Sequence, residues 1–188
     1  SGVYRDIGIP GKDNLPQSSK EQPIILVLHK QGKTTPLIVQ SSGQIDISRD
    51  GEPKSVNLIP QQTGQSNLQI ASWIGDSSQF HFNWSYQLSV PGGGLIERKG
   101  EFNFEAPLDG YQPSDEINMP ATASNWSYDG NKQYFAKLSD GRYARLAIRF
   151  YPGKNRNFIV IQSYVNPTPG DRNLEYNPDQ TTPKTSSP

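Results

Sequence analysis

Residues 79–90 read QFHFNWSYQLSV, and every second residue of this stretch, from Phe80 to Val90, is large and apolar. The residues between them are all polar. Successive side chains of an extended strand leave opposite faces, so this pattern places one set against a core and the other in water. On a helix the same residues would be scattered around the axis and would form no apolar face. The stretch therefore predicts a long strand of an antiparallel sheet with one buried and one wet face.

Further strand-like runs precede and follow this stretch, separated by turn signals such as Asp50-Gly51. The predicted strands are residues 24–29, 36–40, 45–47, 56–59, 68–74, 79–90, 95–106, 132–138, 143–151 and 158–165. The 17 glycines and 16 prolines also favour turns over long helices. The sequence thus predicts an all-β fold, an antiparallel β-sandwich of jelly-roll type with about nine or ten strands and little or no helix.

The ends of the chain differ in composition from its middle. Residues 1–23 contain several prolines and glycines and have almost no periodicity, so we expect an extended leader. Residues 24–178 hold all the predicted strands and are expected to form a single β-sandwich domain. Residues 179–188 read DQTTPKTSSP and predict a flexible tail. The opening Ser1-Gly2 without methionine is typical of a processed terminus or of an expression scar ahead of a domain taken from a larger protein, and we expect other domains of that protein as partners.

The composition argues against several classes of function. Lys+Arg 18 balance Asp+Glu 18, so the chain has no basic surplus for nucleic acid and no polybasic membrane patch. No apolar run approaches the ~20 residues of a membrane-spanning helix. The absence of cysteine excludes disulfides, thiolate metal sites and thiol catalysis.

Residues 107–130 form the longest stretch without a clear strand pattern, and we expect an irregular loop there. A long loop in a compact domain is usually functional or disordered, and the aromatic residues of this one argue against disorder. Its carboxylates Asp109, Asp115 and Glu116 offer the hard oxygen ligands that calcium takes, without the spacing of an EF-hand. A structural calcium ion is therefore the one cofactor hypothesis that the sequence raises.

The sequence contains no nucleophile elbow, phosphate loop or zinc-protease motif, and no catalytic residue is assigned. Glu97, Glu101 and Glu105 lie in one predicted strand, and a pair of carboxylates can cleave glycosidic bonds. A solvated strand face is the simpler interpretation of these glutamates. The sequence therefore favours a protein without catalytic activity.

The predicted strand at residues 143–151 reads YARLAIRFY. Its even-numbered residues suit the core, which leaves rings and guanidinium groups on the outer face, beside Gln162, Tyr164 and Lys137 of the neighbouring strands. Such a face could stack on sugar rings and bond hydroxyl, carboxylate or sulfate groups. Alternatively, these side chains only cover the sheet as a cross-strand ladder. With two tryptophans added, the candidate ligand-binding residues are Tyr143, Arg145, Arg149, Tyr151, Trp126 and Trp73.

The three tryptophans have different predicted surroundings. Trp84 lies on the apolar face of the first strand discussed and is expected in the core, whereas Trp73 is out of phase with the apolar residues of its own strand and points away from them. The tetrapeptide NWSY occurs at residues 83–86 and again at 125–128. The flanking residues do not match, so coincidence explains the second copy better than a repeat does.

The second half of the chain contains the sequences GEFNFEAPLDGYQPSDEINMP, QYFAKLSDGRYARLAIRFYPG and SYVNPTPGDRNLEYNP. Residues 100–178, which include them, resemble an uncharacterised carboxy-terminal β domain of large secreted or surface proteins of bacteria. The resemblance covers less than half of the chain and brings no catalytic motif. It implies an extracytoplasmic accessory domain, secreted or at the cell surface, and assigns no site residue.

Together these features favour a non-catalytic, carbohydrate-binding-type accessory module of a larger secreted bacterial protein, with a polysaccharide as its ligand. One alternative is a structural or adhesion β domain that mediates protein–protein assembly at the cell surface, which an exposed apolar patch or sheet edge would indicate. The other alternative is a jelly-roll polysaccharide-degrading enzyme, which a cleft with converging carboxylates would indicate.

Overall fold

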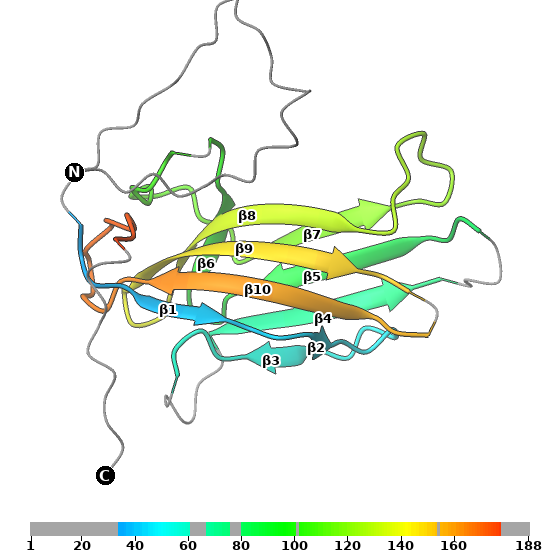
Figure 1. Ribbon diagram of the computed structural model, residues 1–188, viewed down its shortest axis with the longest axis horizontal. Helices are drawn as coiled ribbons and strands as arrows, with labels where there is room; N and C mark the ends of the chain where they lie inside the picture. Colours follow the sequence, from blue (N-terminus) through cyan, green and yellow to red (C-terminus); the bar gives the residue numbers. More distant parts are fainter. Residues whose placement is uncertain (1–33, 61–66, 76–79, 101, 154, 178–188) are drawn as a thin grey trace, which may run out of the picture. The chain divides into compact units, whose positions relative to one another are not determined.

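The computed structural model describes residues 34–60, 67–75, 80–100, 102–153 and 155–177, which contain ten strands and no helix (Figure 1). The strands are β1 (Ile38–Ser41), β2 (Ile45–Asp46), β3 (Lys54–Val56), β4 (Leu68–Ile74), β5 (Trp84–Ser89), β6 (Gly94–Glu97), β7 (Ser114–Met119), β8 (Gly130–Lys137), β9 (Tyr143–Tyr151) and β10 (Phe158–Val165). The leader at 1–23, the predicted strand at 24–29 and the tail at 179–188 lie outside the described residues.

The strands form two antiparallel sheets. The large sheet has the order β1-β10-β9-β8-β6, with β2 also paired to β10, and the small sheet has the order β3-β4-β5-β7. Figure 1 shows them as two layers, with β8, β9 and β10 over β4, β5 and β7. The predicted all-β sandwich is therefore confirmed. The strand order is compatible with a jelly roll, which stays a prediction.

The core lies between the inner faces of the two sheets. Trp84, Tyr86 and Leu88 of β5 alternate inward and are almost fully buried. Phe150 of β9 meets them from the other sheet, with its ring centroid 4.8 Å from that of Tyr86. Burying one such side chain contributes about 1.5–3 kcal/mol, so this two-residue period supplies the main drive for the layers to associate. The prediction that Trp84 belongs to the core is confirmed.

The strand predicted over residues 79–90 is shorter than its pattern suggested. β5 begins at Trp84, and Phe80 is 76% exposed instead of facing the core. Among the described residues, the bond farthest along the β4–β5 hairpin joins the Gly75 amide to the Asn83 carbonyl, and Phe80 lies before β5 begins. The alternation of apolar and polar residues in the sequence therefore extends beyond the strand, to residues that precede Trp84.

Residues 107–130 were expected to be irregular, and this expectation is wrong for β7. β7 is an edge strand of the small sheet, and its inward residues Asp115, Ile117 and Met119 are only half-buried. Because an edge strand needs few large apolar residues, its sequence SDEINM carries a weak alternation. The polar composition concealed the strand.

The predicted strand over residues 95–106 ends at Glu97, and the chain then folds onto the outer face of the large sheet. Residues 102–112 and 166–177, here called the cover, join there through the Leu174 amide, which donates to the Phe104 carbonyl at 2.8 Å. The cover and the sheet beneath it enclose a second apolar cluster. Its buried members are Leu37, Ala106, Phe135, Tyr143 and Leu174. The side chains at one end of the outer face are therefore as fully buried as those of the main core.

A buried polar group connects the two sheets at another point. Asn157 is 5% exposed, and its Nδ2 donates to the Ile47 carbonyl at 3.1 Å and to the Ser72 hydroxyl at 2.6 Å. Its Oδ1 accepts a hydrogen bond from the Tyr86 hydroxyl. Asn157 precedes β10 of the large sheet, whereas Ser72 and Tyr86 belong to the small sheet.

No helix long and apolar enough to cross a membrane occurs in the part of the chain that the structure describes.

Candidate binding site

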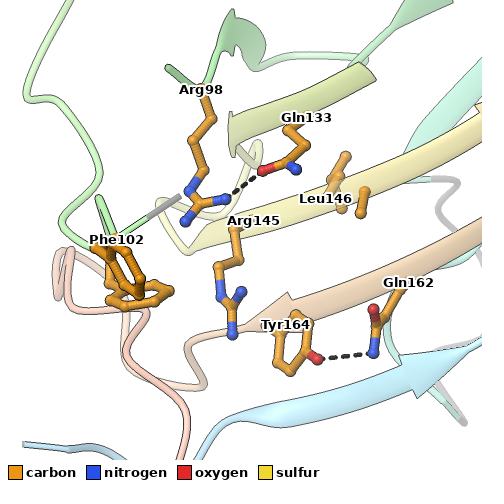
Figure 2. A pocket seen from close by; sticks show the side chains of 9 residues that line it. Arg98, Phe102, Gln133, Arg145, Leu146, Gln162 and Tyr164 are labelled. Atoms are coloured by element: carbon orange, nitrogen blue, oxygen red, sulfur yellow. Dashed lines mark hydrogen bonds between the residues drawn. The ribbon is translucent and has the colours of Figure 1, made fainter. Parts of the chain in front are cut away.

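A pocket of about 330 Å³ lies on the outer face of the large sheet, at the edge of the cover (Figure 2). Strands β8, β9 and β10 supply its floor, the cover supplies aromatic rings, and the segment after β6 supplies a guanidinium group. The described residues that line it are Arg98, Phe102, Phe104, Gln133, Arg145, Leu146, Ala147, Gln162 and Tyr164.

The register of three adjacent strands places the polar residues of the floor. Ala147 of β9 pairs with Gln133 of β8 on one side and with Gln162 of β10 on the other. Two residues farther along the strands, on the same outer face, Arg145 of β9 pairs with Tyr164 of β10. The small side chain of Ala147 between two long amides leaves a depression, since directly opposite side chains in a sheet stand about 5 Å apart.

Arg145 is held between aromatic rings. Its guanidinium carbon lies 3.7 Å from the ring centroid of Tyr164 and 5.0 Å from that of Phe104. Its Nε–H donates to the Leu174 carbonyl of the cover at 2.9 Å. Burial lowers the pKa of Arg145 to about 10, with Tyr164 opposing this change and the charge of Arg98 adding to it, so the group stays protonated at neutral pH.

Arg98 reaches the same pocket from the segment after β6. Its guanidinium carbon lies 5.2 Å from the centroid of the Phe104 ring, the ring that Arg145 also contacts. Its Nε–H donates to the Asn103 carbonyl at 2.6 Å, and its Nη1 donates to the side-chain oxygen of Gln133. Figure 2 shows the side chains of Arg98 and Arg145 among those that line the pocket.

The remaining wall offers a ring and further donors. The Nε2 of Gln162 donates to the Tyr164 hydroxyl at 2.7 Å (Figure 2). A tyrosine hydroxyl that accepts a hydrogen bond still has its own hydrogen to donate. Phe102 is 47% exposed at the rim. The pocket therefore combines a half-exposed aromatic ring with amide, hydroxyl and guanidinium donors.

Only one of the six predicted ligand-binding residues, Arg145, lines this pocket. Tyr143 points to the predicted outer face but is 3% exposed, because the cover lies over it, so the expectation that this ring is accessible is wrong. Arg149 is exposed farther along β9. Tyr151, at the end of β9, stacks on Phe158 with ring centroids 4.7 Å apart. The sequence pattern predicts one continuous outer face for β9. In the fold the cover buries one end of this face and leaves the other end exposed.

Trp126 lies in the β7–β8 connection, which Figure 1 shows at the end of the sandwich opposite to residues 166–177. It is half-buried, and its indole N–H donates to the Phe82 carbonyl at 2.9 Å. Trp84 donates in turn to the Ser127 carbonyl at 2.9 Å. The segment at 125–128 therefore lies against residues 82–84 through two indole bonds, a relation that the sequence comparison of the flanks does not reveal.

Trp73 belongs to the small sheet and is 43% exposed, which confirms that it points away from the core. A Cβ atom added to Gly51 would come within 2.4 Å of the indole Nε1, so the Trp73 ring lies against the Gly51 backbone. Gly51 has φ +91°, a conformation that favours glycine. Trp73 lies on the other sheet and does not line the pocket described above.

The carboxylates proposed for calcium are not brought together. Asp109 is exposed before Gly110, whereas Asp115 accepts a hydrogen bond from the buried Tyr134 hydroxyl at 2.7 Å. Glu116 is the next residue of β7 and faces the opposite side of the small sheet. Within the described residues no group of three His, Cys, Asp or Glu side chains could hold a metal ion.

Two of the glutamates considered for catalysis form ion pairs. Glu97 accepts from the Lys132 ammonium at 2.8 Å, and this bond holds the pKa of Glu97 below its ordinary value. Glu105 pairs with the Arg172 guanidinium at 2.5 Å. Glu101 lies outside the described residues.

Sequence reasoning missed Arg98, Phe102, Phe104 and Gln133 as members of the pocket. The alternation of KQYFAKL at 132–138 could have placed Gln133 on the outer face. No comparable signal exists for Arg98 or the two phenylalanines, because they lie in the segment that leaves the sheet after β6.

Comparison with models of protein families, with curated proteins and with solved structures finds no match to this chain.

Proposed function

We propose that this protein is a non-catalytic, carbohydrate-binding accessory module of a larger bacterial protein that is secreted or held at the cell surface. The observation that supports this most directly is the stacking of Arg145 on Tyr164, with the guanidinium carbon 3.7 Å from the ring centroid. This pair lies in a pocket that the half-exposed Phe102 also lines. A sugar ring has apolar C–H faces and a rim of hydroxyl groups, so it needs a ring to stack on and donors beside it.

The size and the lining of the pocket suit this role. Its volume of about 330 Å³ is at the lower end of small-molecule sites. The pocket is open, so one or two sugar units of a chain could enter it while the chain continues past the rim. The ion pairs of Glu97 and Glu105 engage both carboxylates in structural contacts, which favours binding over glycoside cleavage.

Affinity electrophoresis in gels that contain single polysaccharides tests the proposal, with a panel of neutral and acidic polymers. We expect at least one polymer to retard the protein, and we expect Phe102→Ala to reduce the retardation because it removes the ring at the rim. The matched control is Phe80→Ala, which removes an exposed phenylalanine that does not line the pocket. Absence of retardation by every polymer, or equal losses in both variants, would contradict the proposal.

A further inference from the structure

The floor of the pocket has an amide on either side of a methyl group. Gln133 of β8 and Gln162 of β10 both pair with Ala147 of β9, so the three side chains stand in one row on the outer face. All three residues line the pocket. Adjacent strands of a sheet lie about 4.8 Å apart, which separates the two glutamine backbones by about 9.6 Å, with Ala147 halfway between them.

Each amide of this row is oriented by a hydrogen bond to a neighbouring side chain (Figure 2). The side-chain oxygen of Gln133 accepts from the Nη1 of Arg98, so the NH2 group of Gln133 is the end turned away from Arg98. The Nε2 of Gln162 donates to the Tyr164 hydroxyl at 2.7 Å, so the side-chain oxygen of Gln162 is turned away from Tyr164. Within the described residues, neither that NH2 group nor that oxygen has another partner. The row therefore presents a donor on one side of Ala147 and an acceptor on the other.

The acetamido group of an N-acetylated sugar is complementary to this row. It is a secondary amide, in which the C=O and the N–H point in opposite directions. With one hydrogen bond at each end it spans about 8 Å from donor to acceptor, which suits two long side chains whose backbones are two strand spacings apart. Its methyl group can pack on the methyl group of Ala147 between the two amides.

A pair of adjacent sugar hydroxyls fits the same row less well. Each hydroxyl has one donor and two acceptor positions, so one bond to each glutamine leaves further polar positions over the methyl group of Ala147. A polar group that leaves water without a new partner weakens binding. An acetamido group has a single N–H, which the Gln162 oxygen would accept, and it turns an apolar group toward the floor.

We propose that this pocket selects N-acetylated sugars, in which the acetamido carbonyl accepts from Gln133 and the acetamido N–H donates to Gln162 above Ala147. The inference rests on the proposed function and adds the class of ligand.

Two matched pairs of sugars test this inference by isothermal titration calorimetry. The β-1,4-linked tetramers of N-acetylglucosamine and of glucose differ only in the group on C2, and so do the methyl β-glycosides of N-acetylgalactosamine and of galactose. We expect at least one acetamido member to bind about tenfold more tightly than its hydroxyl partner, since the partner leaves the amides of the floor incompletely bonded.

The outcomes of this comparison separate the two proposals. Equal binding within both pairs would overturn the acetamido selection and leave the proposed function intact. Absence of binding to all four sugars, with a polysaccharide of the gel panel still retarding the protein, would do the same. Absence of binding together with no retardation by any polymer would contradict both proposals.

Two variants that match in charge and in side-chain length locate the effect. Gln133→Glu replaces the donor by oxygens that only accept, so it should weaken the binding of the acetamido sugar about tenfold. Gln162→Glu keeps an oxygen for the acetamido N–H, so it should change this binding by less than about threefold. Equal losses in both variants would show an effect of charge, and unchanged binding in Gln133→Glu would show that this amide does not donate. Either result would overturn the inference.

Folding of both variants is checked by the thermal unfolding midpoint, since Gln133 also accepts from Arg98 and Gln162 also donates to Tyr164. If Gln133→Glu does not fold, Ala147→Val replaces it. Valine suits a strand and fills the space between the two amides, so it should remove the preference for the acetamido sugar. A preference that persists in the folded Ala147→Val variant would overturn the assignment.

Discussion

Asn157 is a single buried amide that precedes β10 of the large sheet, and its side chain makes hydrogen bonds to two residues of the small sheet and to the segment after β2. Replacing it by alanine removes these partners from the Tyr86 hydroxyl and the Ile47 carbonyl, both of which belong to buried residues. A buried polar group without a partner costs about 1–3 kcal/mol, so Asn157→Ala should lower the free energy of unfolding by about 3 kcal/mol, measured by urea denaturation. Asn155→Ala, at an exposed residue nearby, is the control and should change it little. A loss no larger than that of the control would refute the assigned role.

At the scale of elements, the cover is the part of the fold with the most direct bearing on the site. Leu174 is fully buried in it and its carbonyl holds Arg145. Leu174→Ala should destabilise the protein by about 3 kcal/mol, the usual cost of removing a buried leucine side chain. It should also speed hydrogen exchange of the Ala106 amide, which bonds the Arg172 carbonyl at 2.9 Å.

The control for this prediction lies in the cover itself. Leu108 is 69% exposed, so Leu108→Ala should leave both stability and exchange nearly unchanged. If the two leucine variants behave alike, the cover is not held by its apolar cluster.

Elements with strong alternation could be predicted from the sequence, and elements without it could not. β4, β9 and β10 begin and end where the pattern places them, because each has one face in the main core. β7 was missed because an edge strand tolerates polar residues. The cover was missed because alternation identifies the two faces of a strand but not what lies on them. For this reason the pattern placed Arg145 on the outer face, where it lines the pocket, while Tyr143 was expected to be accessible and Arg98 was overlooked.

At the scale of the whole molecule, tyrosine hydroxyls shielded from water should make the stability fall at alkaline pH. Burial raises the pKa of Tyr86, Tyr111 and Tyr134 above the ordinary value of 10.0. In the unfolded chain these groups lose their protons near pH 10, whereas in the fold they keep them. The unfolded state then binds fewer protons, so the free energy of unfolding should stay level below about pH 9 and fall as the pH rises through 10 and above.

Arg145 acts in the opposite direction, since its pKa of about 10 in the fold is below its ordinary value of 12.5. It is one group against three, so a net fall is expected. Urea denaturation at pH 8, 10 and 11, with phenolate absorbance read in parallel, measures this. Tyr86→Phe should reduce the slope of the fall. A free energy of unfolding that rises over this range would contradict the assignment of buried phenols.

The aromatic and carbonyl contacts of Arg145 have a consequence for the speed and cost of recognition. A long cationic side chain on an open surface moves among many rotamers and must stop moving when it grips a ligand, which weakens association by about 0.5–1.5 kcal/mol. Here the Tyr164 ring and the Leu174 carbonyl have already arrested that motion when the chain folds. If a sugar binds here as we propose, it would meet a guanidinium that is already ordered, so less of its binding free energy would be lost in ordering the protein.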